Sequence, residues 1–193
     1  YKVRLIVRAA DGCEDTTFKN VNILGAPQAN FVVEDTCENE VVKFTSLTTP
    51  GSGFLAKEYW WFGDGTTTAG KSPSHYYGTA GYPTVRYIVY NSNLCKDTII
   101  RTLFIANKPY AYFMVKPDCE DLIFPFTNLS SAGIGTISNY SWDFGNGRKS
   151  GQKNENILYP DSGIFNVKLI VTNSYGCRDT NIQKLQVYPR AVA

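Results

Sequence analysis

Cysteine is the reactive side chain whose spacing in this sequence is most regular, and its chemistry is nucleophilic attack, metal ligation or disulfide formation. The chain has 193 residues and five cysteines. Three of them begin the same motif, Cys-x-Asp-Thr, at Cys13, Cys95 and Cys177, which lie 82 residues apart. Cys37 and Cys119 are separated by the same interval. The cysteines therefore belong to an internal repeat, and a copied residue has to be interpreted differently from a single catalytic nucleophile.

Other groups with catalytic chemistry are few. The one histidine, His75, lies in a segment that has no match in the other repeat and that we expect to be a loop. The cysteines lack the short Cys-x-x-Cys spacing of zinc sites, and the sequence has no phosphate-binding loop or dinucleotide fingerprint. A net charge of +2 at pH 7, with the charges scattered, argues against nucleic acid or an anionic membrane as a partner. We expect a protein that is not an enzyme and does not insert into a membrane.

The interval of 82 residues extends along the chain without insertion or deletion. A tryptophan, a phenylalanine and two glycines recur, at Trp60, Phe62, Gly63 and Gly65 and again at Trp142, Phe144, Gly145 and Gly147. We expect the end of a repeat at residues 1–26, full repeats at 27–108 and 109–190, and the start of another at 191–193. A proline at each internal boundary, Pro27 and Pro109, stiffens a short linker. Both ends of the sequence are expected to be cuts in a longer array.

Alternating apolar residues predict β-strands through most of the chain, and no amphipathic helix is found. Three segments have this period of two, with Val3, Leu5 and Val7, then Val85, Tyr87 and Val89, then Val167, Leu169 and Val171 on one half-buried face. Further strands are expected at 30–34, 40–46, 58–62 and 97–106 and at their copies. Short strands between Gly, Asn, Asp and Ser clusters, in units of about 80 residues, are typical of two-sheet sandwiches. The predicted fold class is all-β, an elongated array of tandem immunoglobulin-like sandwiches.

Two motifs resemble the PKD (polycystic kidney disease) domain. They are Tyr-Trp-Trp-Phe-Gly-Asp-Gly from Tyr59 and Tyr-Ser-Trp-Asp-Phe-Gly-Asn-Gly from Tyr140, each followed by a Tyr, a Gly and a Val-rich strand ending in Asn. The sequence departs from the family pattern at Trp61 and Asn146, where the family has Asp, and at Pro83, where it has an aromatic residue. The added cysteines resemble those of PKD arrays in very large Bacteroidota surface proteins, including gliding adhesins exported by type IX secretion.

This resemblance implies two alternative functions. The first is a non-catalytic stalk of a cell-surface adhesin or filament, in cell adhesion or gliding motility, extracellular and attached to the outer membrane through other parts of the protein. Its partners would be neighbouring repeats of the same chain and surface glycans or cell-surface machinery. The alternative is an accessory carbohydrate- or protein-binding module of a secreted hydrolase, and an outward-pointing Trp61 would then be the ligand contact.

The motif residues themselves are interpreted structurally. Trp60, Phe62, Trp142 and Phe144 are expected in the sandwich cores, and Asp64 and Asn146 in tight turns that need positive φ. Since some PKD domains bind calcium, two sets of residues are candidates for it, Asp118, Glu120 and Asp121 and their counterparts Thr36, Glu38 and Asn39. The carboxylates are lost between the copies, so no metal or other cofactor is expected.

Disulfides in an oxidising compartment are the expected chemistry of the cysteines. Two pairings are open: Cys37 with Cys95 and Cys119 with Cys177 inside each repeat, or Cys37 with Cys177 between neighbours. In an immunoglobulin-like sandwich Cys37 would lie in the A–B turn and Cys95 in the F–G turn, and these turns are at opposite ends, about 20 Å apart. A disulfide needs Cα atoms within about 7 Å. In a head-to-tail array, however, the A–B turn of one repeat faces the F–G turn of the next. This geometry favours the pairing between repeats. Cys13, Cys95 and Cys119 would then be unpaired or bonded outside the sequence.

The Asp-Thr pair of each motif has two interpretations. The Asp can cap the F–G turn, and the Thr suits a strand. The segments Asp15-Thr16-Thr17 and Asp97-Thr98-Ile99 also resemble the O-glycosylation signal of Bacteroidota, which makes Thr16 and Thr98 candidate modification sites.

Overall fold

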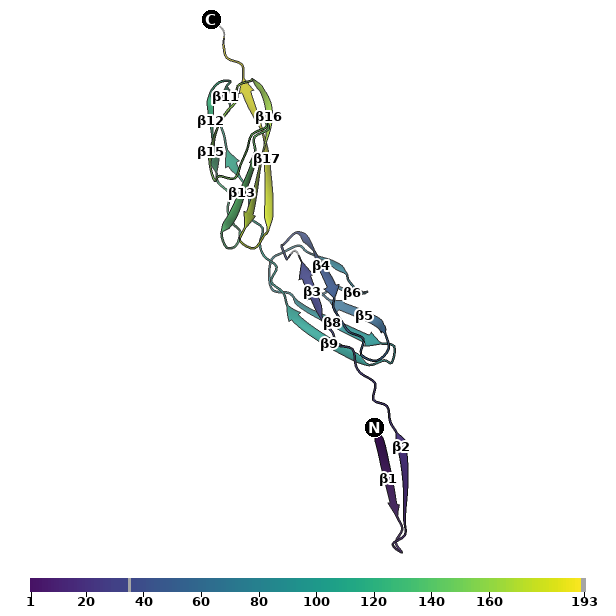
Figure 1. The fold of residues 1–193 in the computed structure, drawn as a ribbon. Coiled ribbons are helices and arrows are strands. Elements are labelled where there is room, and N and C mark those ends of the chain that lie inside the picture. Colours follow the sequence, from purple (N-terminus) through teal and green to yellow (C-terminus); the bar gives the residue numbers. More distant parts are fainter. Residues whose placement is uncertain (35, 192–193) are drawn as a thin grey trace. The chain divides into compact units, whose positions relative to one another are not determined.

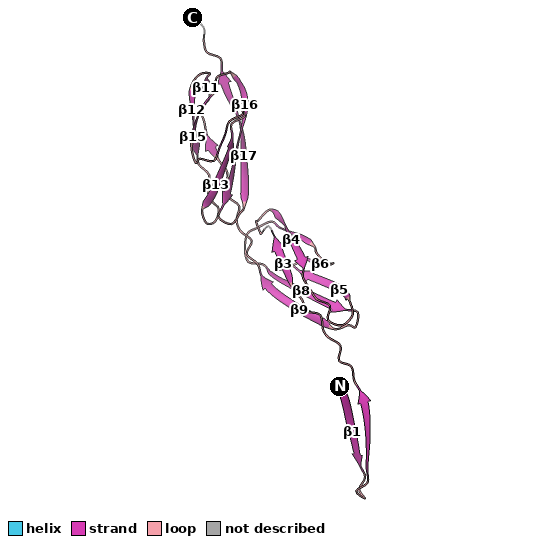
Figure 2. Ribbon diagram, in the orientation of Figure 1, coloured by secondary structure: helices cyan, strands magenta, loops and turns pink. Residues whose placement is uncertain are grey.

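The computed structural model describes residues 1–34 and 36–191, and in these residues it contains strands and no helix (Figure 2). The predicted all-β fold class is confirmed. No helix in the described part of the chain is long and apolar enough to cross a membrane. Most of the expected repeat start at 191–193 lies outside the described residues.

The chain divides into two compact units. One comprises residues 1–32, 44–73 and 84–102, and the other comprises residues 33–43, 74–83 and 103–193. The division does not follow the repeat boundary, because the second unit includes two segments of the first full repeat, 33–43 and 74–83, together with the whole second full repeat.

The first unit begins with a hairpin of β1 (Lys2–Arg8) and β2 (Glu14–Asn20), paired antiparallel (Figure 1). Every residue of both strands is exposed. Val3, Leu5 and Val7, predicted to be half-buried, are 51%, 58% and 58% exposed. The prediction of burial was wrong because, among the described residues, these two strands form a sheet by themselves and no other strand covers either face.

The main sheet of the first unit has the strand order β6-β5-β8-β9, with all neighbours antiparallel. Its strands are β5 (Leu55–Trp61), β6 (Thr67–Ala69), β8 (Thr84–Asn91) and β9 (Lys96–Thr102). Side chains alternate between the two faces of a strand, and here one face is buried. Trp60 and Tyr87 on that face stack with ring centroids 3.8 Å apart. Phe31 and Phe44, from β3 (Phe31–Glu34) and β4 (Glu40–Ser46), pack their rings against Trp60 and complete an aromatic core.

The second unit contains the second full repeat as two sheets around one core. One sheet has the order β10-β12-β15 and the other β11-β17-β16-β13-β14. The strands are β10 (Phe113–Met114), β11 (Asp118–Cys119), β12 (Ile123–Asn128), β13 (Ile137–Asp143), β14 (Lys149–Ser150), β15 (Glu155–Leu158), β16 (Gly163–Asn173) and β17 (Arg178–Tyr188). Trp142 and Phe144 are buried in its core. β7 (Ser74–Tyr77) also belongs to this unit, where it pairs with the first half of β4. His75 therefore lies on a strand, and the prediction of a loop was wrong.

The turn after each core tryptophan differs from the predicted one. Asp64 does not have the expected positive φ; the glycines on either side of it do, with φ of 86° at Gly63 and 91° at Gly65. Oδ1 of Asp64 instead accepts the backbone N–H of Thr66 at 3.0 Å, which closes the turn through a side chain. A Cβ at Gly63 would lie 2.6 Å from the backbone nitrogen of Thr84, so this position requires glycine.

The hydroxyl of Tyr87 is a buried polar group in the aromatic core of the first unit. It donates to Glu58, lies 2.7 Å from the hydroxyl of Ser46, and accepts from Thr48 at 3.2 Å. Burial, reinforced by the bond to Glu58, raises the pKa of Tyr87 from 10.0 to about 12. The folded state thus holds the proton more tightly than the unfolded chain does. This contribution to stability is fully present below pH 10.0 and is lost as the pH rises through about 12.

We expect Tyr87→Phe to lower the free energy of unfolding by about 1–3 kcal/mol at pH 7, because Glu58 loses its buried donor. The variant should also lose part of the decline in stability between pH 10.0 and about 12. Urea unfolding at pH 7 and across the alkaline range measures both effects. Tyr82→Phe, at a tyrosine that is 72% exposed, is the control. A Tyr87→Phe variant with the stability and alkaline slope of the parent would contradict this account.

Candidate functional site

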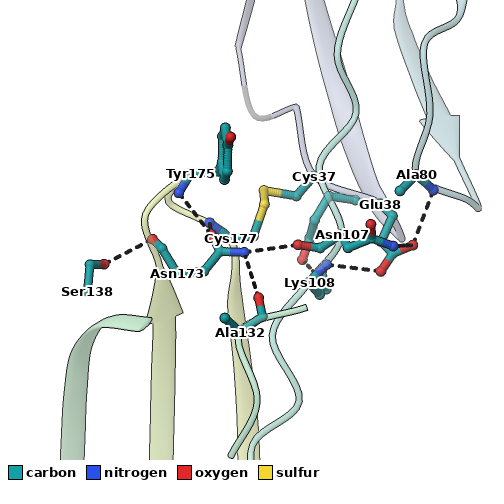
Figure 3. Close-up of a disulfide and its surroundings, with 11 residues drawn as sticks. Cys37, Glu38, Ala80, Asn107, Lys108, Ala132, Ser138, Asn173, Tyr175 and Cys177 are labelled. Carbon is teal, nitrogen blue, oxygen red and sulfur yellow. Dashed lines mark hydrogen bonds and ion pairs between the residues drawn. A yellow bond between two sulfur atoms is a disulfide. The ribbon is translucent and has the colours of Figure 1, made fainter. Parts of the chain in front are cut away.

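A disulfide joins Cys37 to Cys177 in the second unit (Figure 3). The Cα atoms are 5.7 Å apart, and 140 residues separate the two cysteines in the sequence. Cys37 forms a parallel bridge with Ala106, which follows the last strand of the first full repeat. Cys177 precedes β17 and is 1% exposed. The bond therefore connects the two full repeats.

The structure does not contain the alternative pairing inside each repeat. Cys119 pairs with Tyr188 at the end of β17, whereas Cys177 lies just before the start of that strand. A strand of this length, at about 3.3 Å per residue, separates the two cysteines by roughly 30 Å. That distance is far beyond the reach of a disulfide, about 7 Å between Cα atoms. Cys13, Cys95 and Cys119 are free thiols; the first is exposed and the other two are partly exposed.

Glu38, next to the bonded Cys37, holds the linker that connects the repeats. Its carboxylate accepts the backbone N–H of Lys108 at 2.9 Å and the side-chain amide of Asn107 at 3.3 Å. It also accepts the backbone N–H of Ala80 at 3.2 Å. A carboxylate that accepts several N–H groups makes strong, charge-assisted hydrogen bonds. The linker is therefore fixed from the side of the first full repeat.

Asn173, at the end of β16, holds the same linker from the second full repeat. Its side-chain amide donates to the backbone carbonyls of Asn107 at 3.0 Å and Ala132 at 3.2 Å. Its Oδ1 accepts the backbone N–H of Tyr175 and of Cys177, both at 3.1 Å, and so shapes the turn that carries the bonded cysteine. One side chain thus connects the linker to the disulfide.

Close packing and aromatic contacts complete this joint, which we define as the linker Asn107–Lys108, Glu38, Asn173 and the Cys37–Cys177 disulfide. Gly133 has φ of 68°, and a Cβ there would lie 2.0 Å from the carbonyl oxygen of Lys108. Phe104 contacts Tyr82 and Tyr175, with ring centroids 5.2 Å apart in each pair. Phe104 and Tyr82 come from the first full repeat and Tyr175 from the second. The joint therefore combines covalent, polar and apolar contacts.

The polar part of the joint has copies elsewhere in the chain. Glu120 accepts the backbone N–H groups of Ser162 at 2.8 Å and Arg190 at 3.1 Å, and these two residues correspond to Ala80 and Lys108. The bond from the Arg190 N–H, followed by those from Ser162, lowers the pKa of Glu120. Sequence reasoning did not assign Glu38 or Glu120 this role, although their identical spacing was a signal for it.

Asn91 is the copy of Asn173 in the first full repeat. It donates to the carbonyls of Gly25 at 3.0 Å and Pro50 at 3.1 Å, and it accepts the backbone N–H of Asn93 and Cys95. The turn before the cysteine is thus closed by an asparagine, and the prediction that the Asp of the Cys-x-Asp-Thr motif caps this turn was wrong.

The Asp of the motif instead anchors the first strand of its own repeat. Oδ2 of Asp97 accepts the backbone N–H of Ala29 at 2.8 Å, and Oδ2 of Asp179 accepts that of Ala111 at 2.7 Å. The following threonines, Thr98 and the corresponding Thr16 on β2, are exposed. Both are accessible for modification.

The residues considered for calcium take part in turns and backbone hydrogen bonds. In the described residues, no group of three or more His, Cys, Asp and Glu side chains could hold a metal ion. Oδ1 of Asp118 accepts the backbone N–H of Cys119 at 2.8 Å. Asp121 has a φ of 63° and Asn39 a φ of 55°. The carbonyl of Thr36 accepts the N–H of Ala106, so these residues form the turn at the joint and its copy.

Trp61, predicted to point outward, is half-buried on the outer face of the main sheet of the first unit. The guanidinium of Arg86 lies over its ring, 4.2 Å from the centroid. Its neighbours Trp60 and Phe62 are 0% and 2% exposed and belong to the core.

Comparison with known proteins agrees with this architecture. A model of the PKD domain family matches residues 25–104 and 107–187. Over 79 residues the chain is 38% identical to the pre-pro-metalloprotease PrtV of Vibrio cholerae, covering 41% of this chain and 8% of that protein. Over 53 residues it is 40% identical to the collagenase ColA of Clostridium perfringens, covering 28% of this chain and 5% of that protein. The chain therefore spans less than a tenth of the length of these curated relatives.

Solved structures of single domains are similar to part of the chain. The crystal structure of the PKD1 domain from the Vibrio cholerae metalloprotease PrtV is 37% identical, covers 42% of this chain and 98% of that one, and has a TM-score of 0.39. The PKD1 domain of Vibrio anguillarum Epp is 32% identical, covers 43% and 96% of the two chains, and has a TM-score of 0.40.

Replacing Glu38 should release the linker without unfolding either sandwich. In Glu38→Ala we expect the backbone amide of Lys108 to exchange its hydrogen about tenfold faster or more, because a hydrogen bond to a charged group contributes roughly 1.5–3 kcal/mol. Hydrogen exchange followed by NMR measures this rate. Glu120→Ala is the matched control: it should expose the amides of Ser162 and Arg190 and leave that of Lys108 protected. Unchanged exchange at Lys108 in Glu38→Ala would show that Glu38 does not hold the linker.

Proposed function

This chain belongs to the PKD domain family, and we propose that it is a non-catalytic accessory module of an extracellular hydrolase. The proposal is supported by the two curated relatives, a metalloprotease and a collagenase, in which the similar segment covers 8% and 5% of the protein. In both relatives, more than nine tenths of the protein lies outside the similar segment. The disulfide adds support for an extracellular location, since such bonds persist in oxidising compartments.

The joint suggests how such a module works. A linker of two residues is held by a carboxylate, an amide and a disulfide, each of which restricts hinge motion. Tandem domains otherwise move relative to one another by default. The module would hold whatever it carries at a defined separation, so that a catalytic domain or a binding surface is presented rather than left on a flexible tether.

A second candidate function is the stalk of a cell-surface adhesin, in which many such repeats follow one another. The observation that favours it is the copied joint chemistry. Glu120 already makes the two backbone hydrogen bonds that Glu38 makes at the joint, and Cys119 beside it is a free thiol. Further repeats would bond to Cys119 through their F–G cysteine and to Cys95 through their A–B cysteine. Export by type IX secretion, gliding motility and attachment to the outer membrane belong to this second candidate.

The gene that encodes the chain distinguishes the two candidates. A catalytic domain with a few PKD repeats supports the accessory module, and a long array of cysteine-containing repeats without a catalytic domain supports the stalk.

For the accessory module, deletion of the repeats from the parent enzyme should reduce activity on an insoluble polymer and leave activity on a small soluble substrate unchanged. Equal loss on both substrates would argue against an accessory role.

The disulfide should limit access to the linker. Peptide mapping of the unreduced chain is expected to recover a peptide that joins Cys37 to Cys177. A Cys37→Ser/Cys177→Ser variant should be less stable by about 2–4 kcal/mol and should be cut faster by proteases at residues 107–109. Cys95→Ser, at a free thiol, is the control. A peptide joining Cys37 to Cys95 would refute the disulfide between the repeats.

Glycosylation gives a further test of the bacterial-surface hypothesis. If Thr16 and Thr98 are modified, intact-mass analysis of native protein should show added hexose-containing mass that disappears in Thr16→Val/Thr98→Val. Thr180→Val, at the copy followed by Asn181, should leave the mass of the sugar unchanged. Native protein with the unmodified mass would remove both sites.

A further inference from the structure

The outer face of the main sheet of the first unit carries a row of aromatic and basic side chains. Trp60, Tyr87 and Val89 point into the core, so strand alternation turns their neighbours outward. The outward set that concerns us, the aromatic–cationic face, is Lys57, Tyr59 and Trp61 on β5, Arg86 and Tyr90 on β8, and Lys96 on β9. All six residues lie in one compact unit.

The register of the sheet places these side chains in one strip. Trp61 is paired with Arg86, Lys57 with Tyr90, and Tyr90 with Lys96 across neighbouring strands. The ring of Tyr59 lies between the other two aromatic rings, 6.5 Å from that of Trp61 and 6.3 Å from that of Tyr90. A hollow lined by Lys57, Tyr59 and Tyr90 runs beside them. The strip therefore presents three rings and three cations together.

The fold does not require these aromatic residues. The second full repeat has the same strand register and the same irregularity near the start of its strand, in β13 and β16. At the three aromatic positions it has Ser141, Asp143 and Thr172. The same order of four antiparallel strands, β14-β13-β16-β17, thus forms without them. One exposed and two half-buried aromatic side chains, Tyr59 with Trp61 and Tyr90, thus form a contiguous group on a solvent-facing sheet face without a structural need, which is typical of an interaction surface.

The charges of the face are all positive and unbalanced. Among the described residues, no ion pair involves Lys57, Arg86 or Lys96. The nearest carboxylates on the same strands point the other way: Glu58 accepts from the Tyr87 hydroxyl and Asp97 from the backbone of Ala29. A ligand with acidic groups would complement this surface.

We propose that the aromatic–cationic face binds an acidic polysaccharide, one that carries carboxylate or sulfate groups. Sugar rings present flat C–H faces that stack on aromatic rings, and the basic groups would bind the acidic substituents. An acidic polypeptide fits less well, because peptides commonly add as a strand to a free sheet edge. β5 and β8 are central strands with a partner on each side, so their backbone groups are already used. This inference rests on the accessory-module function and specifies its substrate class.

The test uses the whole chain and two acidic polysaccharides, polygalacturonate and dextran sulfate, with neutral dextran for comparison. We expect binding in isothermal titration calorimetry to at least one acidic polymer, weakened by salt, and none to dextran. The variant Tyr59→Ser/Trp61→Ala/Tyr90→Thr should bind at least tenfold more weakly, and Tyr110→Ser, at an exposed ring elsewhere, should bind as the parent does. Ser and Thr are the residues of the second repeat at two of these positions, which protects the fold.

A second pair of variants tests the charges. Arg86→Gln should weaken binding severalfold and reduce its dependence on salt, whereas Lys168→Gln, in the same register of the second repeat, should change neither. Full binding by the aromatic variant, or no binding of either acidic polymer by the parent, would overturn the inference. So would equally tight binding of poly-glutamate, since it would indicate a general attraction for polyanions or polypeptides. A parent gene without a catalytic domain would remove the accessory-module function and leave these binding results as they are.

Discussion

The joint depends on one requirement, that the peptide groups of a short linker find hydrogen-bond partners. The linker Asn107–Lys108 precedes a proline, so it cannot continue a strand ladder. Glu38 accepts the backbone N–H of Lys108 and the side-chain amide of Asn107, and Asn173 donates to the backbone carbonyl of Asn107. These two residues are adjacent in space or sequence to the two bonded cysteines: Glu38 follows Cys37, and Asn173 accepts the N–H of Cys177. The disulfide and the hydrogen bonds therefore restrain the same short segments of the chain.

Comparison of the two full repeats distinguishes residues that the fold needs from residues that vary between the copies. Core tryptophans, turn glycines, a linker-binding Glu and the Asn before the F–G cysteine occur in both full repeats, and the Glu and Asn residues make corresponding hydrogen bonds to backbone groups. Some core side chains differ, such as Tyr87 against Leu169, but many differences lie on the outer faces of the sheets, such as Trp61 against Asp143. Divergence at the second kind of position costs little stability, because those side chains are not needed for the sheets to form. It is there that separate functions can be acquired by individual repeats.

The sequence was sufficient to predict the all-β fold and the tandem repeat, because periods of 2 and of 82 residues report directly on pleating and on copied structure. It was insufficient where a side chain forms hydrogen bonds with residues that are far away in the sequence. The role of Glu38 depends on a linker 70 residues away, and that of Asp97 on a backbone amide 68 residues away. Turn chemistry was also misassigned, since a side-chain-closed turn and a turn of two positive-φ residues both use Asp-Gly. Burial of the first hairpin was predicted from strand alternation alone, which does not show whether a second sheet covers the apolar face.

The copies of the joint that carry free cysteines show that its hydrogen bonds form without a disulfide. Asn91 holds the turn at Cys95 by the same hydrogen bonds that Asn173 makes at Cys177, although Cys95 is a free thiol. Glu120 likewise binds its backbone donors beside the free Cys119. The local geometry around Cys95 and Cys177 is therefore set by an asparagine, and a glutamate follows Cys37 and Cys119 and binds backbone donors of its own repeat or linker. Because the ends are already ordered, a disulfide between repeats closes with little further loss of conformational freedom, and its effect is to make a joint that hydrogen bonds have shaped difficult to open.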